Sequence, residues 1–182
     1  FPGGAPRLFG HRAGPRVWTE LAGPDSTRSR FTVFHVAVKN YSYPKVRIDP
    51  ARAVIEADNG REYLSLSLQQ LENYYRAYAL GYRGNEYSRL RERLDLLRRT
   101  LLSDAIVFSG QEAEGFVVFP ALHTDVHAVR VLLPEVVLRF DYREEPIETT
   151  QIACSFHRLT GRLYPDGRRV VRDSSDDGSV AR

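Results

Sequence analysis

The chain has 182 residues, of which 42% are hydrophobic and 27% charged, with a formal net charge of +3 at pH 7. These values are typical of one globular domain with flanking arms. They provide neither the dense basic stripe of a nucleic-acid-binding surface nor the run of about 20 apolar residues that spans a bilayer. We therefore expect no nucleic-acid partner, and membrane proximity only through partner proteins.

The first 30 residues are rich in Gly, Pro and Arg and show no period of 2 or 3.6, which predicts an extended arm over 1–30. The arm carries large apolar side chains such as Phe9 and Trp18, which a purely solvated linker would lack. We expect both to contact other protein chains. Because the chain begins with Phe1 and contains no Met, we also expect a product processed from a precursor with a targeting segment.

Strand signals follow the arm. β-Branched and aromatic residues predict a strand at 31–40, and a second extended stretch covers 45–57 with an interruption at Pro50. The D-N-G tripeptide at 58–60 indicates a tight turn, because Asn and Gly tolerate positive φ. Residues 61–66 are then the expected hairpin partner.

The pattern changes to helical spacing after residue 66. Leu and Tyr side chains recur at steps of three and four from Leu68 to Leu101, with a break at G-Y-R-G (81–84). Asn85 suits the N-cap of the second helix. We predict an αα-hairpin over about 67–103, whose apolar seam packs on the rest of the fold or docks a partner.

Strand character then resumes and continues nearly to the end of the chain. The expected strands are 105–108, 113–119, 126–133, 136–142 and 147–157. Short strands separated by turn signals predict a mainly β fold, an antiparallel β-sandwich, rather than a parallel α/β sheet. The sandwich domain should cover 31–157, and the polar composition of 158–182 predicts a tail.

Three segments together carry a resemblance: FTVFHVAVKNYSYPKVRIDP (31–50), VIEADNGREYLSL (54–66) and FSGQEAEGFVVFP (108–120). Over residues 31–142 their order is similar to telokin-like immunoglobulin domains of bacterial secreted proteins and lipoproteins. The resemblance implies an immunoglobulin-like sandwich with the helical hairpin inserted into it. It also implies a non-catalytic binding module in the periplasm or outside the cell. The helical block is longer than the family's usual connection, and no cysteine for lipidation stands at the N-terminus.

One group of side chains suggests a metal site. His123, Asp125 and His127 would share a face if they lay on a strand, and they could hold Zn²⁺ with one open position. The alternative is an exposed strand edge or loop after Pro120, where polar residues belong. We predict no metal and no other cofactor.

The sequence also lacks the usual signatures of catalysis. It contains no P-loop, no G-x-G-x-x-G, no G-x-S-x-G and no C-x-x-C-H motif. Cys154 alternates with Ile152 and Phe156, as a small buried hydrophobic residue does. We therefore predict that the protein is not an enzyme and has no catalytic residues.

The predicted hairpin is rich in tyrosine and arginine, and tyrosine is enriched at interfaces because it combines a large area with a polar tip. The expected protein-binding residues on it are Tyr75, Tyr78, Tyr82, Tyr87, Arg89 and Arg93. We predict an accessory or scaffolding subunit of an extracytoplasmic assembly, for which a membrane-bound respiratory or photosynthetic complex is one host. The alternatives are a periplasmic ligand-binding domain, with a pocket between sandwich and hairpin, or a metal-binding protein using the His/Asp/His group.

Overall fold

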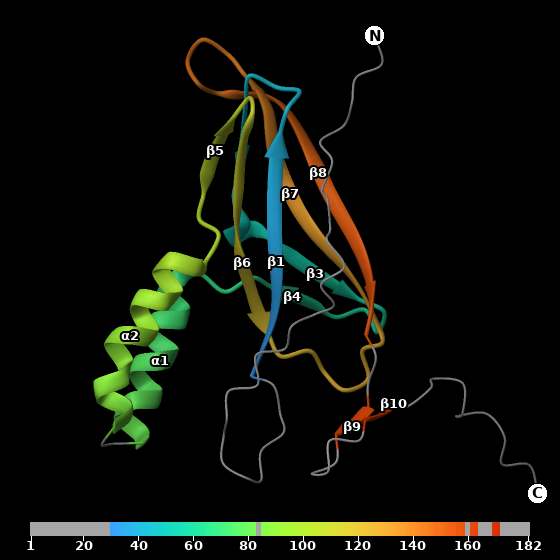
Figure 1. Ribbon diagram of the computed structural model, residues 1–182. Coiled ribbons are helices and arrows are strands. Elements are labelled where there is room, and N and C mark those ends of the chain that lie inside the picture. Colours follow the sequence, from blue (N-terminus) through green and yellow to red (C-terminus); the bar gives the residue numbers. More distant parts are fainter. Residues whose placement is uncertain (1–29, 83–84, 159–160, 164–168, 172–182) are drawn as a thin grey trace, which may run out of the picture.

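The computed structural model describes residues 30–82, 85–158, 161–163 and 169–171. Phe9, Trp18 and the rest of 1–29 therefore lie outside the described residues, as do 172–182 of the predicted tail. The described fold is mainly β, as predicted, and two antiparallel sheets enclose one hydrophobic core (Figure 1). A third, two-stranded sheet of β9 (Gly161–Leu163) and β10 (Arg169–Val171) lies in the region predicted as a tail, and no strand was predicted there.

The larger sheet is organised around β7 (Ala128–Phe140). One edge of β7 pairs first with β3 (Val54–Ala57) and then with β2 (Lys45–Ile48), and its other edge pairs with β8 (Pro146–His157). Next to β3 lies β4 (Glu62–Leu64), and next to β2 lies β5 (Ala105–Phe108). The D-N-G turn at 58–60 joins β3 and β4 as predicted, with Gly60 at φ 78°.

The smaller sheet consists of β1 (Phe31–Asn40) and β6 (Gln111–Pro120), which pair antiparallel from Phe31↔Pro120 to Asn40↔Gln111. Because side chains alternate along a strand, β1 sends every second residue into the core. Those from Phe34 to Val38 join a cluster with residues of β6, β2, β3 and β7. The core therefore lies between the two sheets.

A buried asparagine shapes the turn between β1 and β2. The Nδ2 group of Asn40 donates to the carbonyl oxygens of Tyr43 and Val107, both at 2.9 Å. Its Oδ1 atom accepts from the N–H groups of Ser42 and Tyr43, at 3.3 and 3.0 Å. The side chain is only 3% exposed in the folded chain, so these four bonds satisfy a polar group that would be costly to bury alone.

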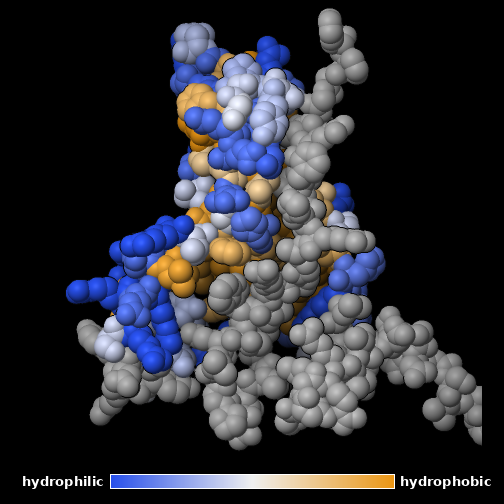
Figure 2. Space-filling view, viewed as in Figure 1, coloured by the Kyte–Doolittle hydropathy of each residue, from blue (hydrophilic) through white to orange (hydrophobic). Residues whose placement is uncertain are grey.

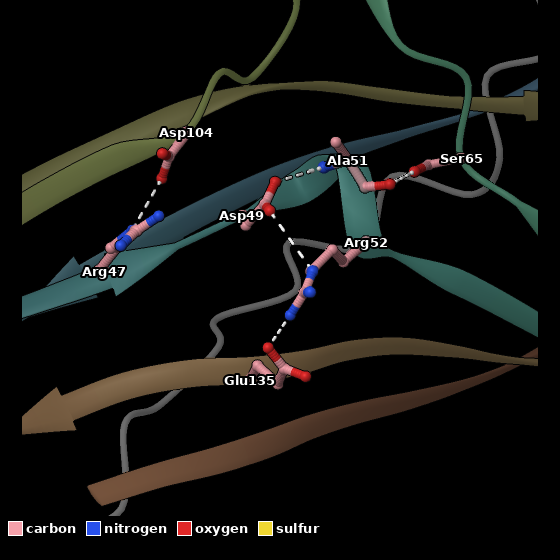
Figure 3. Close-up of polar contacts among 7 residues, drawn as sticks. All are labelled: Arg47, Asp49, Ala51, Arg52, Ser65, Asp104 and Glu135. Atoms are coloured by element: carbon pink, nitrogen blue, oxygen red, sulfur yellow. Dashed lines mark hydrogen bonds and ion pairs between the residues drawn. The ribbon is translucent and has the colours of Figure 1, made fainter. Parts of the chain in front are cut away.

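The extended stretch at 45–57 is interrupted at Pro50, as predicted, and forms the two strands β2 and β3. A short 3₁₀ turn, η1 (Pro50–Arg52), replaces the strand, and the Asp49 carboxylate accepts from the Ala51 N–H at 3.1 Å. Ser65 Oγ donates to the Ala51 carbonyl at 2.8 Å, which ties the turn to the chain beyond β4 (Figure 3).

The prediction of two strands at 126–133 and 136–142 is wrong. β7 is one strand that runs through Pro134 and Glu135, with a register shift between Leu133 and Val136 and Glu135 at φ 53°. A bulge accommodates a proline without ending the strand, because the bulged residues leave the ladder. An ion pair between Glu135 and Arg52 links this bulge to η1 (Figure 3).

Between β4 and β5 the chain forms α1 (Leu68–Tyr82) and α2 (Asn85–Thr100), in the region with helical spacing. The two helices pack against each other and project from one side of the sheets (Figure 1). Leu71 and Ala79 are the buried apolar residues of α1. Neither of these described helices has the length and apolar character needed to cross a bilayer.

Candidate protein-binding surface

The helix pair is attached to β6 at both of its ends. Just before α1, the Leu66 N–H donates to the Val118 carbonyl at 2.7 Å, and just after α2 the Leu102 N–H donates to the Phe116 carbonyl at 3.0 Å. Carbonyl groups two residues apart point to the same edge of a strand. Both attachments therefore occupy one edge of β6, opposite the edge that pairs with β1.

A capping box starts α1. Gln70 Oε1 accepts from the Ser67 N–H at 2.8 Å, and Ser67 Oγ accepts from the Gln70 N–H at 3.3 Å. This reciprocal pair satisfies two backbone donors that have no partner within the helix. The S-x-x-Q spacing is a local signal, and it fixes the first helical turn directly beside the attachment of Leu66.

Glycine is required at the second attachment. A Cβ atom on Gly115 would lie 2.6 Å from the Leu102 nitrogen and 2.7 Å from its Cα. Such an approach is far inside van der Waals contact, so any side chain at this position would displace the backbone of Leu102. Gly115 thus lets the end of the helix pair lie directly on β6.

The two helices are joined by a nearly buried carboxylate. The Glu72 side chain on α1 is 7% exposed and accepts from Arg98 of α2, at 2.9 Å to Nε and 2.8 Å to Nη2. Arg76, one turn along α1, donates to the other carboxylate oxygen at 3.1 Å. Two charge-assisted partners compensate for removing this carboxylate from water.

Where β1 begins, the helix pair carries a group of side chains that we name the Tyr–Arg cluster. It consists of Arg30, Phe31, Tyr74, Tyr75, Tyr78 and Arg93. The Tyr74 ring packs edge-on against Phe31, with centroids 4.9 Å apart, and its hydroxyl accepts from Arg30. The cluster therefore fixes α1 against the first residues of β1.

Both arginines of the cluster also lie near tyrosine rings. The Arg30 guanidinium is 5.0 Å from the Tyr78 centroid, and the Arg93 guanidinium of α2 is 5.5 Å from the same centroid. Arg93 is also 5.8 Å from the Tyr75 ring. These are cation–π distances. The three tyrosines and Arg93 are half-buried, so each packs within the cluster and still presents part of its surface to solvent.

The structure brings together only part of the predicted protein-binding set. Tyr75, Tyr78 and Arg93 meet in the Tyr–Arg cluster, and Arg89 is exposed one helical turn before Arg93. Tyr82 and Tyr87 belong to α1 and α2, but their side chains lie outside the described residues. Arg30 and Phe31 were not among the predicted residues, since nothing in the local sequence connects them to Tyr74, which is more than 40 residues away.

Hydrophilic and hydrophobic surfaces separate at the helix pair. Figure 2 shows mostly hydrophilic surface over α1 and α2, with hydrophobic surface on the sandwich beside them. The last turn of α2 contains Arg98, which pairs with Glu72, and Arg99, which pairs with Asp95. Tyrosine and arginine side chains that are already ordered lose little conformational freedom when a partner binds.

The suggested metal ligands do not share a strand face. His123, Asp125 and His127 lie on the loop between β6 and β7, and β7 begins only at Ala128. The Asp125 carboxylate accepts from Asn59 Nδ2 at 3.0 Å, and this bond lowers the pKa of Asp125. Within the part of the chain that the structure describes, no group of three His, Cys, Asp or Glu residues is placed to hold a metal ion.

An open cleft of about 320 Å³ lies at the end of the larger sheet where β7 finishes at Phe140. Its lining residues are Arg47, Asp104, Ala105, Ile106, Phe140 and Glu144. Arg47 and Asp104 form an ion pair at 3.5 Å across it (Figure 3). The cleft is lined by residues of β2, β5, β7 and their loops, and not by the tyrosines of α1, where the alternative of a ligand-binding domain would have its pocket.

The geometry thus offers an ordered Tyr- and Arg-rich surface on a helix pair that is firmly attached to a β framework. Such side chains contribute area, hydrogen bonds and charge to contacts between proteins. Comparison of the chain with protein-family models, with curated proteins and with solved structures gives no match.

Proposed function

We propose that the protein is a non-catalytic accessory or scaffolding subunit that binds other proteins through the helix pair. The observation that carries this proposal is the Tyr–Arg cluster, in which half-buried tyrosines are held in place by arginines and by the start of β1. Interfaces favour these residue types, and order before binding reduces the entropy that binding costs.

The proposal includes an immunoglobulin-like framework, in which α1 and α2 are an insertion between β4 and β5. It also includes an extracytoplasmic location in the bacterial cell envelope, within a larger assembly such as a membrane-bound respiratory or photosynthetic complex. Support for both parts comes from the resemblance of residues 31–142 to telokin-like domains. The strand order, with both ends of the helix pair on β6, is compatible with an insertion.

Site-specific photocrosslinking in cells that express the native protein tests this function. A benzophenone side chain at Arg89, exposed on α2, should capture a defined partner that mass spectrometry identifies. The same side chain at Gln151, exposed on β8, serves as the position control. Capture of the same partners at both positions, or of none at Arg89, would count against a docking role for the helix pair.

A pair of charge reversals sharpens the result. Arg93→Glu removes a cation from the Tyr–Arg cluster and should abolish capture at position 89. Arg91→Glu makes the same charge change two residues away, on another side of α2, and should leave capture intact. If both variants reduce capture equally, general charge accounts for binding and the cluster does not.

A further inference from the structure

The two sheets do not match in width. Six strands on one side face only β1 and β6 on the other. Among the described residues, β1 pairs with β6 alone and β8 pairs with β7 alone, so each has one edge without a strand neighbour. The rings of Phe34 on β1 and Phe156 on β8 lie 5.1 Å apart, which places these two strands near each other across the core.

The smaller sheet covers the core face of the larger sheet only as far as the boundary between β7 and β8. On β7 the core-facing residues Val129 and Val131 are buried. Their direct neighbours on β8, Phe156 and Cys154, face the same side but are only half-buried. Neighbouring strand residues on one face normally share one environment. The difference indicates that one strand's width of apolar surface next to β1 needs further cover.

The open edge of β1 and the core-facing side chains of β8 form what we call the slot. The edge of β1 offers backbone N–H and C=O groups, which would pair with an extended segment. The floor offers Ile152, Cys154 and Phe156 at every second position of β8. An occupant therefore needs to be extended, free of proline and able to turn apolar side chains of one face toward this floor.

We infer that the slot binds residues 16–22 of the same chain (RVWTELA), which would add to the open edge of β1. This segment contains no proline, and Val17, Thr19 and Leu21 share one strand face, which is apolar at both of its ends. Seven extended residues span about 23 Å, within the roughly 33 Å of ten-residue β1. Residues 23–30, which include Gly23 and Pro24, are long enough to reverse the chain between the two strands.

The full-length chain supplies its own reporter, because Cys154 is the only cysteine and forms part of the floor. The double substitution V17D/L21D should prevent the segment from covering the floor. We expect it to raise the rate of Cys154 alkylation by iodoacetamide by about tenfold, since access controls thiol reaction. The control L8D/A13D makes the same kind of change outside the segment and should leave the rate unchanged. Equal rates in the wild type and V17D/L21D would overturn the inference.

Amide hydrogen exchange in the unmodified chain tests the same inference without a variant. Alternate N–H groups of β1 point to β6 and to the open edge. If residues 16–22 pair there, both sets should be protected in a protein that light scattering shows to be monomeric. Fast exchange of the amide hydrogen at every second β1 residue would overturn the inference. Protection that appears only in a dimer would also overturn it, because the segment would then come from a second copy.

Discussion

The backbone of Leu102 lies against Gly115 so closely that a Cβ atom on Gly115 would be 2.6 Å from the Leu102 nitrogen. We expect Gly115→Ala to lower the free energy of unfolding by about 2 kcal/mol, because overpacking against backbone forces the chain to shift. Urea denaturation measures the change. Gly81→Ala in α1 is the matched control: its Cβ would meet nothing within 4 Å, so the better helix former should be neutral or slightly stabilising. Equal losses in both variants would contradict a special role for Gly115.

Glu72 and Arg98 should be energetically coupled. A double-mutant cycle with Glu72→Ala and Arg98→Ala should give a coupling of about 1–2 kcal/mol, because the carboxylate is removed from water when it pairs. The exposed pair Asp95–Arg99, at 53% and 76% side-chain exposure, is the control and should couple by about 0.5 kcal/mol or less. Similar coupling energies for the two pairs would mean that the burial of Glu72 does not strengthen its interaction with Arg98.

Stability should depend on pH through Glu112. Hydrogen bonds from Lys39 and Tyr41 lower the pKa of this carboxyl below its usual 4.5. A lowered pKa in the folded state gives stabilisation that is present above about pH 4.5 and lost as the pH falls through the folded-state value. Glu112→Gln should therefore flatten the pH dependence of the urea midpoint as the pH falls below about 4.5. Glu62→Gln makes the same substitution at an exposed position of β4 and serves as the control for the substitution itself.

Glu135 occupies the bulge of β7 at φ 53°, where most side chains are strained. Glu135→Val should destabilise the protein by about 1–2 kcal/mol more than Glu135→Gly, because β-branched residues fit positive φ poorly. Both variants lose the ion pair with Arg52, so their difference reports on the backbone. Arg52→Ala removes the ion pairs of Arg52 with Glu135 and with Asp49 together, and this loss at the surface should cost less than about 1 kcal/mol. Identical midpoints for the Val and Gly variants would contradict strain at this residue.

Local signals made part of the fold predictable. The break at Pro50 and the turn at 58–60 depend on a few adjacent residues, and both are present as expected. The continuity of β7 could not be foreseen, because Pro134 is tolerated only where a bulge forms between β7 and its neighbours. The local sequence shows the proline but does not show which strands pair with β7 on either side of it.

The candidate site was predictable to a similar degree. Helical spacing placed Tyr75 and Tyr78 on one element, and they do meet Arg93. The contact of Tyr74 with Arg30 and Phe31 joins residues more than 40 positions apart, and it arises only because β6 carries both the helix pair and β1. Long-range placement of this kind comes from topology, which periodicity alone does not specify.

The chain leaves the β framework at Leu66 and re-enters it at Leu102, and these two residues bond to β6 carbonyls only two positions apart. Two strand positions correspond to about 7 Å, a distance that a short linker can span. The segment between them is therefore exchangeable in principle: a Gly-Ser bridge from Leu66 to Leu102 would leave every strand partner of the two sheets in place. The same geometry would let helical arms of other lengths be grafted at this point without changing the register of any strand.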